Sequence, residues 1–367
     1  MSEAHSETKS PVVLGGRVAF FPSAEYLATN PYWPLLKGAL EELGAEVVPS
    51  TPLTFGRRWL WNHRGDVRVL HIHFVQPFYA YESVHARLRW VVRFARSLAL
   101  ARLFGYRTVF TLHDLRSPRP LQPAWVDYLG YWVAANCTDR VIVHCAAARS
   151  ALRSHYGRRR GVHVVEHPGY VGVLPNRIDR DTARARFGLQ PHQRVFLFFG
   201  ALRRTKGVDD LIAAFTALGD ADVRLLIAGA PDPPSELQYW QARCAHDARI
   251  HLEPRYIADD EVEWFMNAAD AVVFPFAEIL TSGSVHLAMS FARPVIAPAR
   301  GCLPELLAPD AGLLYDPNVP EGLRSALQHC LTADVATLGR AAFERVRTRT
   351  WRAAAEQTLA IYAGTAD

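Results

Sequence analysis

The sequence from Phe198 to Val208, FFGALRRTKGV, decides how the second half of the chain folds. The apolar run Arg194–Phe199 leads into a turn with two glycines and three cations, and a helical pattern follows. Glycine lets the backbone approach a ligand closely, and a helix start offers N–H groups and a positive dipole end. Arginine can grip phosphate oxygens as a fork, and lysine adds a mobile charge. The turn favours a diphosphate site with Gly200, Arg203 and Lys206. The alternative is a solvated turn whose cations only improve solubility.

Apolar runs of strand length alternate with helical patterns along the whole chain, which is typical of a parallel sheet with helices on both faces. Two series of strands follow one another. The first is predicted at Arg17–Phe21, Val67–Phe74, Arg107–Leu112, Arg140–His144 and Val162–Val165, and the second at Arg194–Phe199, Arg224–Ala228, Ala271–Phe274 and Pro294–Ala297. The predicted fold is therefore α/β, with two Rossmann-like domains facing across a cleft.

The predicted boundary lies in residues 167–180, HPGYVGVLPNRIDR, which carry two prolines and two glycines and have no clear period. A length of 367 residues also suits two domains better than one. We expect an N-terminal domain at 1–170 and a C-terminal domain at 171–340. One long helical pattern, Gly339–Tyr362, predicts a last segment, 341–367, that packs back towards the N-terminal domain. Ligands of such sheets bind beyond the carboxyl ends of the strands.

A second polar turn follows a strand at residues 274–284, FPFAEILTSGS. Ser282 or a neighbouring serine is a natural N-cap for the next helix. The Glu278 carboxylate, beside the hydroxyls of Thr281 and Ser282 and the backbone of Gly283, suits hydrogen bonds to sugar hydroxyls or to a phosphate. The alternative is an ordinary capped helix that happens to follow a glutamate.

Taken in order, these segments resemble the retaining family 4 glycosyltransferases, which have the two-domain GT-B fold. Residues 200–207 look like the family's G-R-L-x-x-x-K-G motif, with Lys206 in place. Ala201 stands where the family has arginine, and we expect Arg203 to take over that role. Three further segments resemble the family's A-D-x-x-x-x-P, A-M-A-x-G-x-P-V and G-x-x-E motifs, namely 269–275, 288–295 and 301–305.

The resemblance implies a hexosyltransferase with a nucleotide-sugar donor, retention of configuration, no metal and no cofactor. It makes Glu278 the first of two family glutamates. The second position falls on His286 or Leu287, so the carboxylate that usually holds the nucleotide ribose is missing. The Thr281–Gly283 turn is similar to that of a bacterial branch acting on cell-surface polysaccharides and to lipid-linked mannosyltransferases. The implied acceptor is a glycan or a lipid-linked glycan.

The N-terminal half supplies a second set of candidates. His113 follows a predicted strand and resembles the family's active-site histidine, which contacts the transferred sugar. The alternative is a strand-end histidine bonded to backbone. His71 and His73 end another strand, and we expect only one of them to face a given side. His73 lies nearer the strand end and, with Asn30 after the first strand, is the candidate for the acceptor side.

Charge is unevenly distributed along the chain. Residues 57–160 hold 18 arginines, no lysine and five acids, a net +13 in a chain of net +5. Such a segment suits an anionic partner: nucleic acid, anionic lipid or a lipid diphosphate. Lysine is rare throughout, which explains the choice of arginine but not the lack of acids. On the predicted helix Val84–Leu103, the residues Arg89, Arg93 and Arg96 share one stripe, which favours peripheral contact with an anionic membrane.

Several classes are excluded or ranked below glycosyl transfer. Nothing resembles a known DNA- or RNA-binding motif, so no nucleic-acid partner is expected. No apolar run is long enough to cross a bilayer. Five scattered cysteines without paired spacing indicate reduced thiols and a cytoplasmic protein, with possible attachment to the inner face of the plasma membrane. The remaining alternatives are a sugar-phosphate epimerase on the same architecture and a non-catalytic, arginine-rich nucleic-acid or membrane-binding protein.

Overall fold

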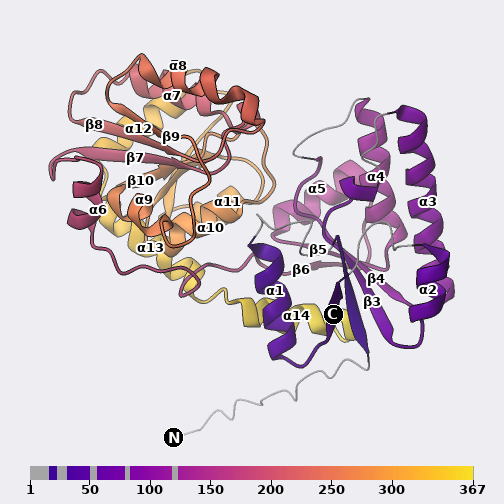
Figure 1. Ribbon diagram of the computed structural model, residues 1–367. Helices are drawn as coiled ribbons and strands as arrows, with labels where there is room; N and C mark the ends of the chain where they lie inside the picture. The colour runs from indigo at the N-terminus through magenta and orange to yellow at the C-terminus, as the bar shows by residue number, and fades with distance from the viewer. Residues whose placement is uncertain (1–15, 23–30, 50–55, 79–82, 118–122, 367) are drawn as a thin grey trace, which may run out of the picture. The chain divides into compact units, whose positions relative to one another are not determined.

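The computed structural model of the chain describes residues 16–22, 31–49, 56–78, 83–117 and 123–366. The chain forms two compact units (Figure 1). Unit 1 comprises Met1–Glu166 with Trp351–Asp367, and unit 2 comprises His167–Thr350. Each unit has one parallel six-stranded sheet, which confirms the prediction of two Rossmann-like α/β domains.

The sheet of unit 1 has the strand order β2-β1-β3-β4-β5-β6. Its strands are β1 (Arg17–Phe21), β2 (Val47–Pro49), β3 (Val67–Ile72), β4 (Arg107–Thr111), β5 (Arg140–Val143) and β6 (Val162–Val164). Its helices are α1 (Tyr32–Glu42), α2 (Arg57–His63), α3 (Val84–Leu103), α4 (Ala124–Cys137), α5 (Ala146–Tyr156) and α14 (Trp351–Ala363).

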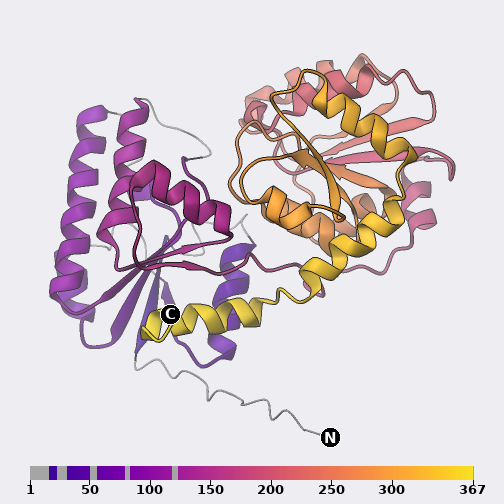
Figure 2. The ribbon, with the colours of Figure 1, turned by 180° about the vertical axis from the view of Figure 1, so that it is seen from behind.

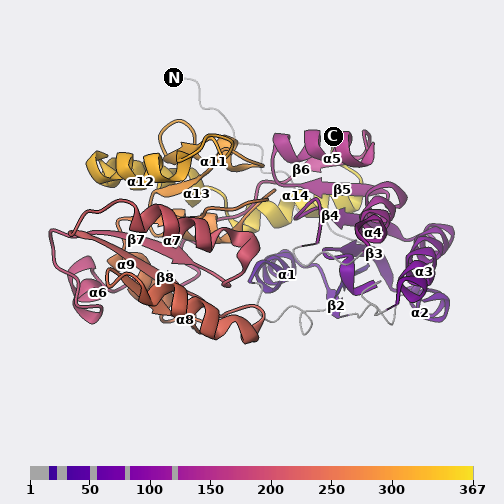
Figure 3. The same cartoon turned by 90° about the horizontal axis from the view of Figure 1, so that it is seen from above.

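Two sets of helices cover the two faces of this sheet. α1 and α14 lie side by side on one face, where Trp33 and Leu359 join the core formed with β1 and β3 (Figure 2). On the other face α3 lies beside α4, with α2 next to α3 (Figure 3). α3 buries its apolar stripe, Val91, Phe94 and Leu98, as its helical period requires.

The C-terminal segment differs from its prediction. The long helical pattern Gly339–Tyr362 forms two helices, α13 (Val335–Arg347) and α14, rather than one. The break falls at residues 348–350, where the carbonyl of Arg349 accepts a 2.8 Å hydrogen bond from the Gly169 N–H instead of continuing a helix. The expected boundaries at 170 and 340 lie at 166 and 350 in the structure, because α13 packs in unit 2 and only α14 belongs to unit 1.

The sheet of unit 2 has the order β12-β11-β10-β7-β8-β9. Its strands are β7 (Arg194–Phe199), β8 (Val223–Ala228), β9 (Ile250–Glu253), β10 (Ala271–Val273), β11 (Val295–Pro298) and β12 (Gly312–Tyr315). Its helices, besides α13, are α6 (Arg180–Arg186), α7 (Val208–Thr216), α8 (Leu237–Ala245), α9 (Val262–Ala268), α10 (Gly283–Ser290), α11 (Leu303–Leu307) and α12 (Gly322–Thr332), with 3-10 turns η4 (Arg204–Lys206) and η5 (Pro234–Glu236).

The strands that the sequence did not reveal are β2, β9 and β12. All three lie at sheet edges, where one side of the strand has no neighbour and the apolar run is short. In β9, for example, Ile250 and His251 are not buried, so no continuous apolar pattern marks the strand. The central strands are buried on both faces, and their apolar runs predicted them.

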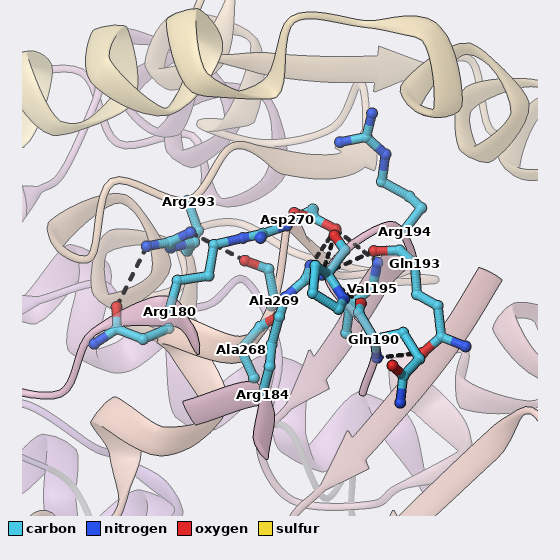
Figure 4. A network of polar contacts seen from close by, with 12 residues as sticks. Arg180, Arg184, Gln190, Gln193, Arg194, Val195, Ala268, Ala269, Asp270 and Arg293 are labelled. Atoms are coloured by element: carbon cyan, nitrogen blue, oxygen red, sulfur yellow. Dashed lines mark hydrogen bonds and ion pairs between the residues drawn. The ribbon is translucent and has the colours of Figure 1, made fainter. Parts of the chain in front are cut away.

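A buried ion pair joins β7 to β10 at the amino ends of the strands (Figure 4). Asp270, directly before β10, accepts hydrogen bonds from the Val195 N–H at 2.8 Å and from Arg184 Nη2 at 2.7 Å. Its other oxygen accepts from Arg180 at 2.8 Å. Arg184 is 2% exposed and also donates to backbone carbonyls, including that of Ala268. Burial lowers the pKa of Arg184, while the Asp270 carboxylate opposes that effect.

We predict that Arg184→Leu lowers the free energy of unfolding by about 3–5 kcal/mol, because it leaves Asp270 buried with too few partners. Arg180→Leu is the matched control. Its side chain is 41% exposed, so we expect a loss of about 1 kcal/mol or less. Urea unfolding followed by circular dichroism measures both. Equal losses in the two variants would contradict this assignment.

Candidate active site

In unit 2 the strand order places two loops at the point where the chain changes direction across the sheet. From β7 the chain moves to β8 and β9 on one side, and from β10 it moves to β11 and β12 on the other. The loops after β7 and β10 are therefore neighbours. Open α/β sheets bind ligands at this switch point. These loops are the two polar turns that the sequence singled out.

Close backbone approaches hold three loops together at this edge. Gly207 has φ +72°, and a Cβ added there would come within 2.0 Å of the Pro275 carbonyl oxygen. Gly229, after β8, is similarly close to Gly200, because its added Cβ would lie 2.0 Å from the Gly200 carbonyl oxygen. Only glycine fits such contacts without displacing backbone. The loops after β7, β8 and β10 thus form one surface.

Lys206 and Ser284 converge over Gly200. A Cβ added to Gly200 would lie 3.3 Å from Lys206 Nζ and 3.7 Å from Ser284 Oγ, and Gly200 itself has φ +134°. The ammonium group comes from η4 and the hydroxyl from the first turn of α10. A positive charge and a hydroxyl beside bare backbone are the groups that bind phosphate oxygens. The structure therefore brings Gly200 and Lys206 together with the second polar turn.

The two arginines of the first turn are engaged by acids. Arg203 Nε donates to the Asp232 carboxylate, which follows β8. Arg204 is exposed, donates to Glu236 at 2.8 Å and stacks its guanidinium 4.1 Å from the centre of the Tyr239 ring. Lys206 is thus the cation placed over Gly200, while Arg203 carries a partly neutralised charge beside it.

The start of α10 is built from the Thr281, Ser282 and Gly283 turn. Ser282 occupies the N-cap position, but its side chain makes no capping hydrogen bond, so the expected cap is not formed. Thr281 Oγ1 is buried and has no hydrogen-bond partner among the described residues. A Cβ on Gly283 would lie 2.9 Å from the Tyr170 hydroxyl, so a larger residue there would have to displace that side chain. An uncapped helix start with hydroxyls attracts anions.

Glu278 is exposed in the loop between β10 and α10. The loop that follows β11 contacts the backbone of the residues directly after Glu278. Cys302 N–H donates to the Leu280 carbonyl at 2.8 Å, and a Cβ on Gly301 would lie 2.5 Å from the Ile279 carbonyl oxygen. The segment 301–305, singled out by its resemblance to a family motif, thus buttresses the backbone beside Glu278.

His286 is one of the two positions, with Leu287, on which the resemblance places the family's second glutamate. It is 3% exposed, its Nδ1 lies 3.0 Å from the Ser282 carbonyl oxygen, and its ring stacks on His167 with 4.3 Å between centroids. His286 therefore packs against the inner side of the α10 start. A buried imidazole in this place cannot substitute for an exposed ribose-binding carboxylate.

In unit 1 four histidines gather at the carboxyl ends of the central strands. His71 and His73 come from β3, His113 follows β4 and His144 follows β5. His73 Nδ1 lies 3.4 Å from His113 Nε2. The His113 ring stacks on Phe74 with 5.0 Å between centroids and is only partly buried.

The prediction that His71 and His73 face different sides was wrong. Their ring centroids are 4.0 Å apart, because residues two apart on a strand point to the same face. His71 is fixed by Thr111 Oγ1 at 2.7 Å and by the Tyr362 hydroxyl of α14 at 2.5 Å. His73 is 2% exposed, and its Nε2 has no partner among the described residues.

Burial keeps this cluster neutral. Desolvation lowers the pKa of His71, His73 and His113 well below the ordinary histidine value, and neighbouring histidines add to the effect. Desolvation also lowers the pKa of His144, to about 4, against a smaller opposing effect of its 2.9 Å hydrogen bond to the Val165 carbonyl. His113 is therefore a hydrogen-bonding group rather than a cation at neutral pH.

Some expectations fall outside what the structure describes or remain untested. Asn30 lies outside the described residues. Among the residues that are described, no group of three or more His, Cys, Asp or Glu side chains is arranged to hold a metal ion. Within the same ranges, no helix combines the length and the apolar character needed to cross a bilayer.

Sequence reasoning missed several residues that shape these sites. Gly229 and Asp232 were not singled out, although a glycine directly after the predicted strand Arg224–Ala228 is a recognisable signal. Tyr170 reaches the start of α10 from the predicted linker, and Tyr362 reaches His71 from the C-terminal helix. These two contacts join residues far apart in the sequence, so no local pattern reveals them.

Comparison with known proteins identifies the family. Residues 193–333 match the family described as "Glycosyl transferases group 1". The chain is 30% identical over 309 residues to D-inositol 3-phosphate glycosyltransferase 1 of Catenulispora acidiphila, covering 77% of this chain and 72% of that protein. The chain belongs to the group 1 (family 4) glycosyltransferases. It is therefore a glycosyltransferase, of the class that uses nucleotide-sugar donors.

A second relative and two solved structures agree with this family. GDP-mannose:glycolipid 4-beta-D-mannosyltransferase of Xanthomonas campestris pv. campestris is 28% identical over 311 residues, covering 82% of this chain and 79% of that protein. Anabaena HepE in complex with UDP has a TM-score of 0.71 at 18% identity, covering 95% of this chain and 100% of HepE. WaaG, a glycosyltransferase of lipopolysaccharide biosynthesis, has a TM-score of 0.65 at 16% identity, covering 95% of this chain and 100% of WaaG. The two structural likenesses show the GT-B fold alone.

We predict that Lys206→Ala weakens donor binding by roughly 10- to 150-fold, because it removes a charge-assisted hydrogen bond of about 1.5–3 kcal/mol. Arg204→Ala removes a cation from the same turn, one that is already paired with Glu236, and should leave the donor affinity within about twofold. Isothermal titration with the nucleotide diphosphate of the active donor measures both. Equal affinities for Lys206→Ala and wild type would remove Lys206 from the site.

We also predict that stability falls as the pH drops from 6.5 towards 4. Between pH 6.5 and 4, His144 is protonated in the unfolded chain but stays neutral in the folded cluster. Unfolding therefore takes up a proton and becomes more favourable as the pH falls. His144 alone accounts for about 3 kcal/mol of this loss.

His144→Asn, which can keep the hydrogen bond to Val165, should flatten the fall relative to wild type. The matched control His246→Gln changes an exposed histidine and should fall as wild type does. Urea unfolding at several pH values measures the difference. The same slope in His144→Asn and wild type would contradict the prediction.

Proposed function

We propose that this glycosyltransferase moves a hexose from a nucleotide-sugar donor to a glycan acceptor carried on a lipid, with retention and without a metal ion. The observation that carries the proposal is the convergence of Lys206 Nζ, Ser284 Oγ and the α10 start over Gly200. The mannosyltransferase of Xanthomonas is named for a glycolipid acceptor, which supports the acceptor class.

The donor diphosphate binds at this convergence. When the bond between the anomeric carbon and the diphosphate oxygen breaks, negative charge builds on the diphosphate. Lys206, the Ser284 hydroxyl and the N–H groups that begin α10 stabilise that charge. These groups are the reason that no metal is required. Arg203 approaches the same phosphate from its contact with Asp232, and the unpartnered Thr281 hydroxyl donates to the phosphate or to the sugar.

Glu278 and His113 act on the transferred sugar. Glu278 is exposed at the loop that follows β10, where its carboxylate can accept hydrogen bonds from sugar hydroxyls. Neutral His113 supplies Nδ1 to the sugar, while its Nε2 contacts Nδ1 of His73. The acceptor hydroxyl attacks the anomeric carbon, the bond to the diphosphate oxygen breaks, and the hydroxyl proton passes to the departing diphosphate oxygen.

The stereochemical outcome has a direct readout. Retention rests on the resemblance to the retaining family, whereas the Xanthomonas relative is named for a β-linked product. Proton NMR of the product gives the anomeric coupling constant. A product with the anomeric configuration opposite to that of the donor would overturn retention without affecting the assignment as a glycosyltransferase.

The experiment that tests the function is a panel of UDP-, GDP-, ADP- and dTDP-sugars, first by thermal shift. A donor at 100 times its dissociation constant adds about 2.7 kcal/mol of stability. The active donor is then incubated with lipid-linked glycan acceptors, and nucleotide release is compared with and without acceptor. Interconversion of the sugar without transfer would favour the epimerase alternative.

In that assay we predict that His113→Ala lowers kcat by at least 100-fold while the donor dissociation constant changes by less than about fivefold, because the histidine acts mainly in the transition state. Glu278→Gln should lower kcat in the same way. Melting temperatures equal to wild type serve as the folding control. A parallel loss of donor affinity and kcat would instead place His113 in ground-state binding.

Peripheral contact with an anionic membrane is the second part of the proposal. The support is the net +13 of residues 57–160. Each Lys or Arg side chain near an anionic membrane surface contributes about 1 kcal/mol to the free energy of binding. An enzyme that stays at the membrane face meets a lipid-linked acceptor without extracting it.

A further inference from the structure

Unit 1 contains a groove of about 890 Å³ between the start of α2 and one side of α3. Arg57 lies at the α2 side, and Arg89, Arg93 and Arg96 line it from α3. The helical spacing predicted that the last three share a stripe, and the structure places all of them in this one groove. All four side chains are exposed.

These arginines differ from those of unit 2. Among the described residues none of the four forms an ion pair with an acid, and no acid lines the groove. In unit 2, by contrast, Arg203, Arg204 and most other arginines of the loops and helices are paired with carboxylates. Like charges that share one concave surface repel one another, and the repulsion is relieved when an anion binds among them.

Apolar side chains line the same groove. Leu88 is 36% exposed and Val92 is 53% exposed, although both lie between the arginines on α3. The packing of α3 on the sheet does not explain them, because Val91, Phe94 and Leu98 form that buried stripe. Arg93 stacks its guanidinium 4.4 Å from the centre of the Trp90 ring, which leaves its charge without an acid among the described residues. The groove thus combines cations that no described acid neutralises with exposed hydrocarbon.

Exposed aromatic residues also lie on the helices next to α3. Trp61 on α2 is 52% exposed, and Trp125 and Trp132 on α4 are 49% and 40% exposed. α4 packs beside α3 on this face of unit 1 (Figure 3). Tryptophan and arginine around an apolar strip are typical of side chains that sit at the boundary between headgroups and acyl chains.

We propose that the α2–α3 groove is a docking site for an anionic glycerophospholipid, whose phosphate is held by Arg57, Arg89, Arg93 and Arg96. Leu88 and Val92 contact the first part of its acyl chains. The inference deepens the proposed function, because it assigns membrane attachment to one groove rather than to the net charge of unit 1. The groove shares no residue with the donor loops of unit 2.

Flotation of the full chain with vesicles tests the site. The vesicles are phosphatidylcholine alone, or phosphatidylcholine with one-third phosphatidylglycerol, at low and at high salt. We expect binding only to the phosphatidylglycerol vesicles and weaker binding at high salt. Replacing Arg89, Arg93 and Arg96 together by glutamine should weaken binding on the order of 100-fold.

A charge-matched control separates the groove from net charge. Arg149, Arg153 and Arg159 are exposed elsewhere on unit 1, and their replacement by glutamine removes the same charge. This control should bind within about threefold of wild type. A third variant, Leu88→Ser with Val92→Ser, should keep the preference for phosphatidylglycerol but bind more weakly.

Several outcomes would overturn the proposal. Equal losses in the two arginine triples would assign binding to net charge, and equal binding to both vesicle types would exclude a phosphate contact. Competition by millimolar sn-glycerol 3-phosphate as strong as that by vesicles would indicate a soluble phosphate ligand. Binding to duplex DNA that the groove triple abolishes, without vesicle binding, would indicate a nucleic-acid site.

Transfer to a water-soluble acceptor distinguishes this proposal from the proposed function. The groove triple should retain wild-type turnover on such an acceptor. If vesicle binding fails while transfer persists, only the docking site is wrong. If vesicle binding follows the groove but no donor is turned over, the docking site stands and the proposed function fails.

Discussion

The pairing of β7 with β10 is the constraint on which the proposed donor site depends. The ladder between these strands is short, with Ala271 opposite Phe196 and Val272 opposite Leu197. At the amino end of this ladder, the buried Asp270 carboxylate adds a further link between the strands. It accepts hydrogen bonds from the Val195 N–H and from the Arg184 guanidinium. With the strands fixed at that end, their loops meet at the other end, where Gly207 lies against Pro275. The pairing therefore requires a glycine at position 207, because the two adjacent strands bring their loops closer together than a Cβ permits.

The two units use the same architecture with different electrostatics. In unit 2, Lys206 lies over Gly200 at the carboxyl edge, and Asp232 and Glu236 bind the neighbouring Arg203 and Arg204. In unit 1, the corresponding edge holds histidines that burial keeps neutral, and the excess positive charge lies on α2 and α3 instead. Neutral histidines suit hydroxyl groups, and unpaired arginines suit phosphates.

The last helix completes the histidine cluster of unit 1. α14 lies beside α1 and brings the Tyr362 hydroxyl to His71, which also binds Thr111. This contact fixes both nitrogens of His71, and the ring of His71 in turn packs on that of His73. The orientation of His73, and through it that of His113, therefore depends on a segment that follows the whole of unit 2 in the sequence. Loss of α14 would leave His71 with one partner and the α1 face of the sheet uncovered.

The sequence by itself determined the fold class, the central strands and the two polar turns of unit 2. It could do so because buried parallel strands are continuous apolar runs, and because a strand, a glycine, cations and a helix follow one another locally around Lys206. It also placed Arg89, Arg93 and Arg96 on one stripe, since helical periodicity is a local property. Three edge strands, β2, β9 and β12, escaped notice because their apolar runs are short.

Only the tertiary structure decided which of these residues meet. The ion pair of Arg184 with Asp270, the approach of Tyr170 to Gly283 and the bond from Tyr362 to His71 join positions far apart in the chain. The break between α13 and α14 contains no proline or glycine to mark it, and there the Arg349 carbonyl accepts the Gly169 N–H, which lies far away in the sequence. Local sequence fixes the period and the polarity of an element, and packing alone fixes its partners.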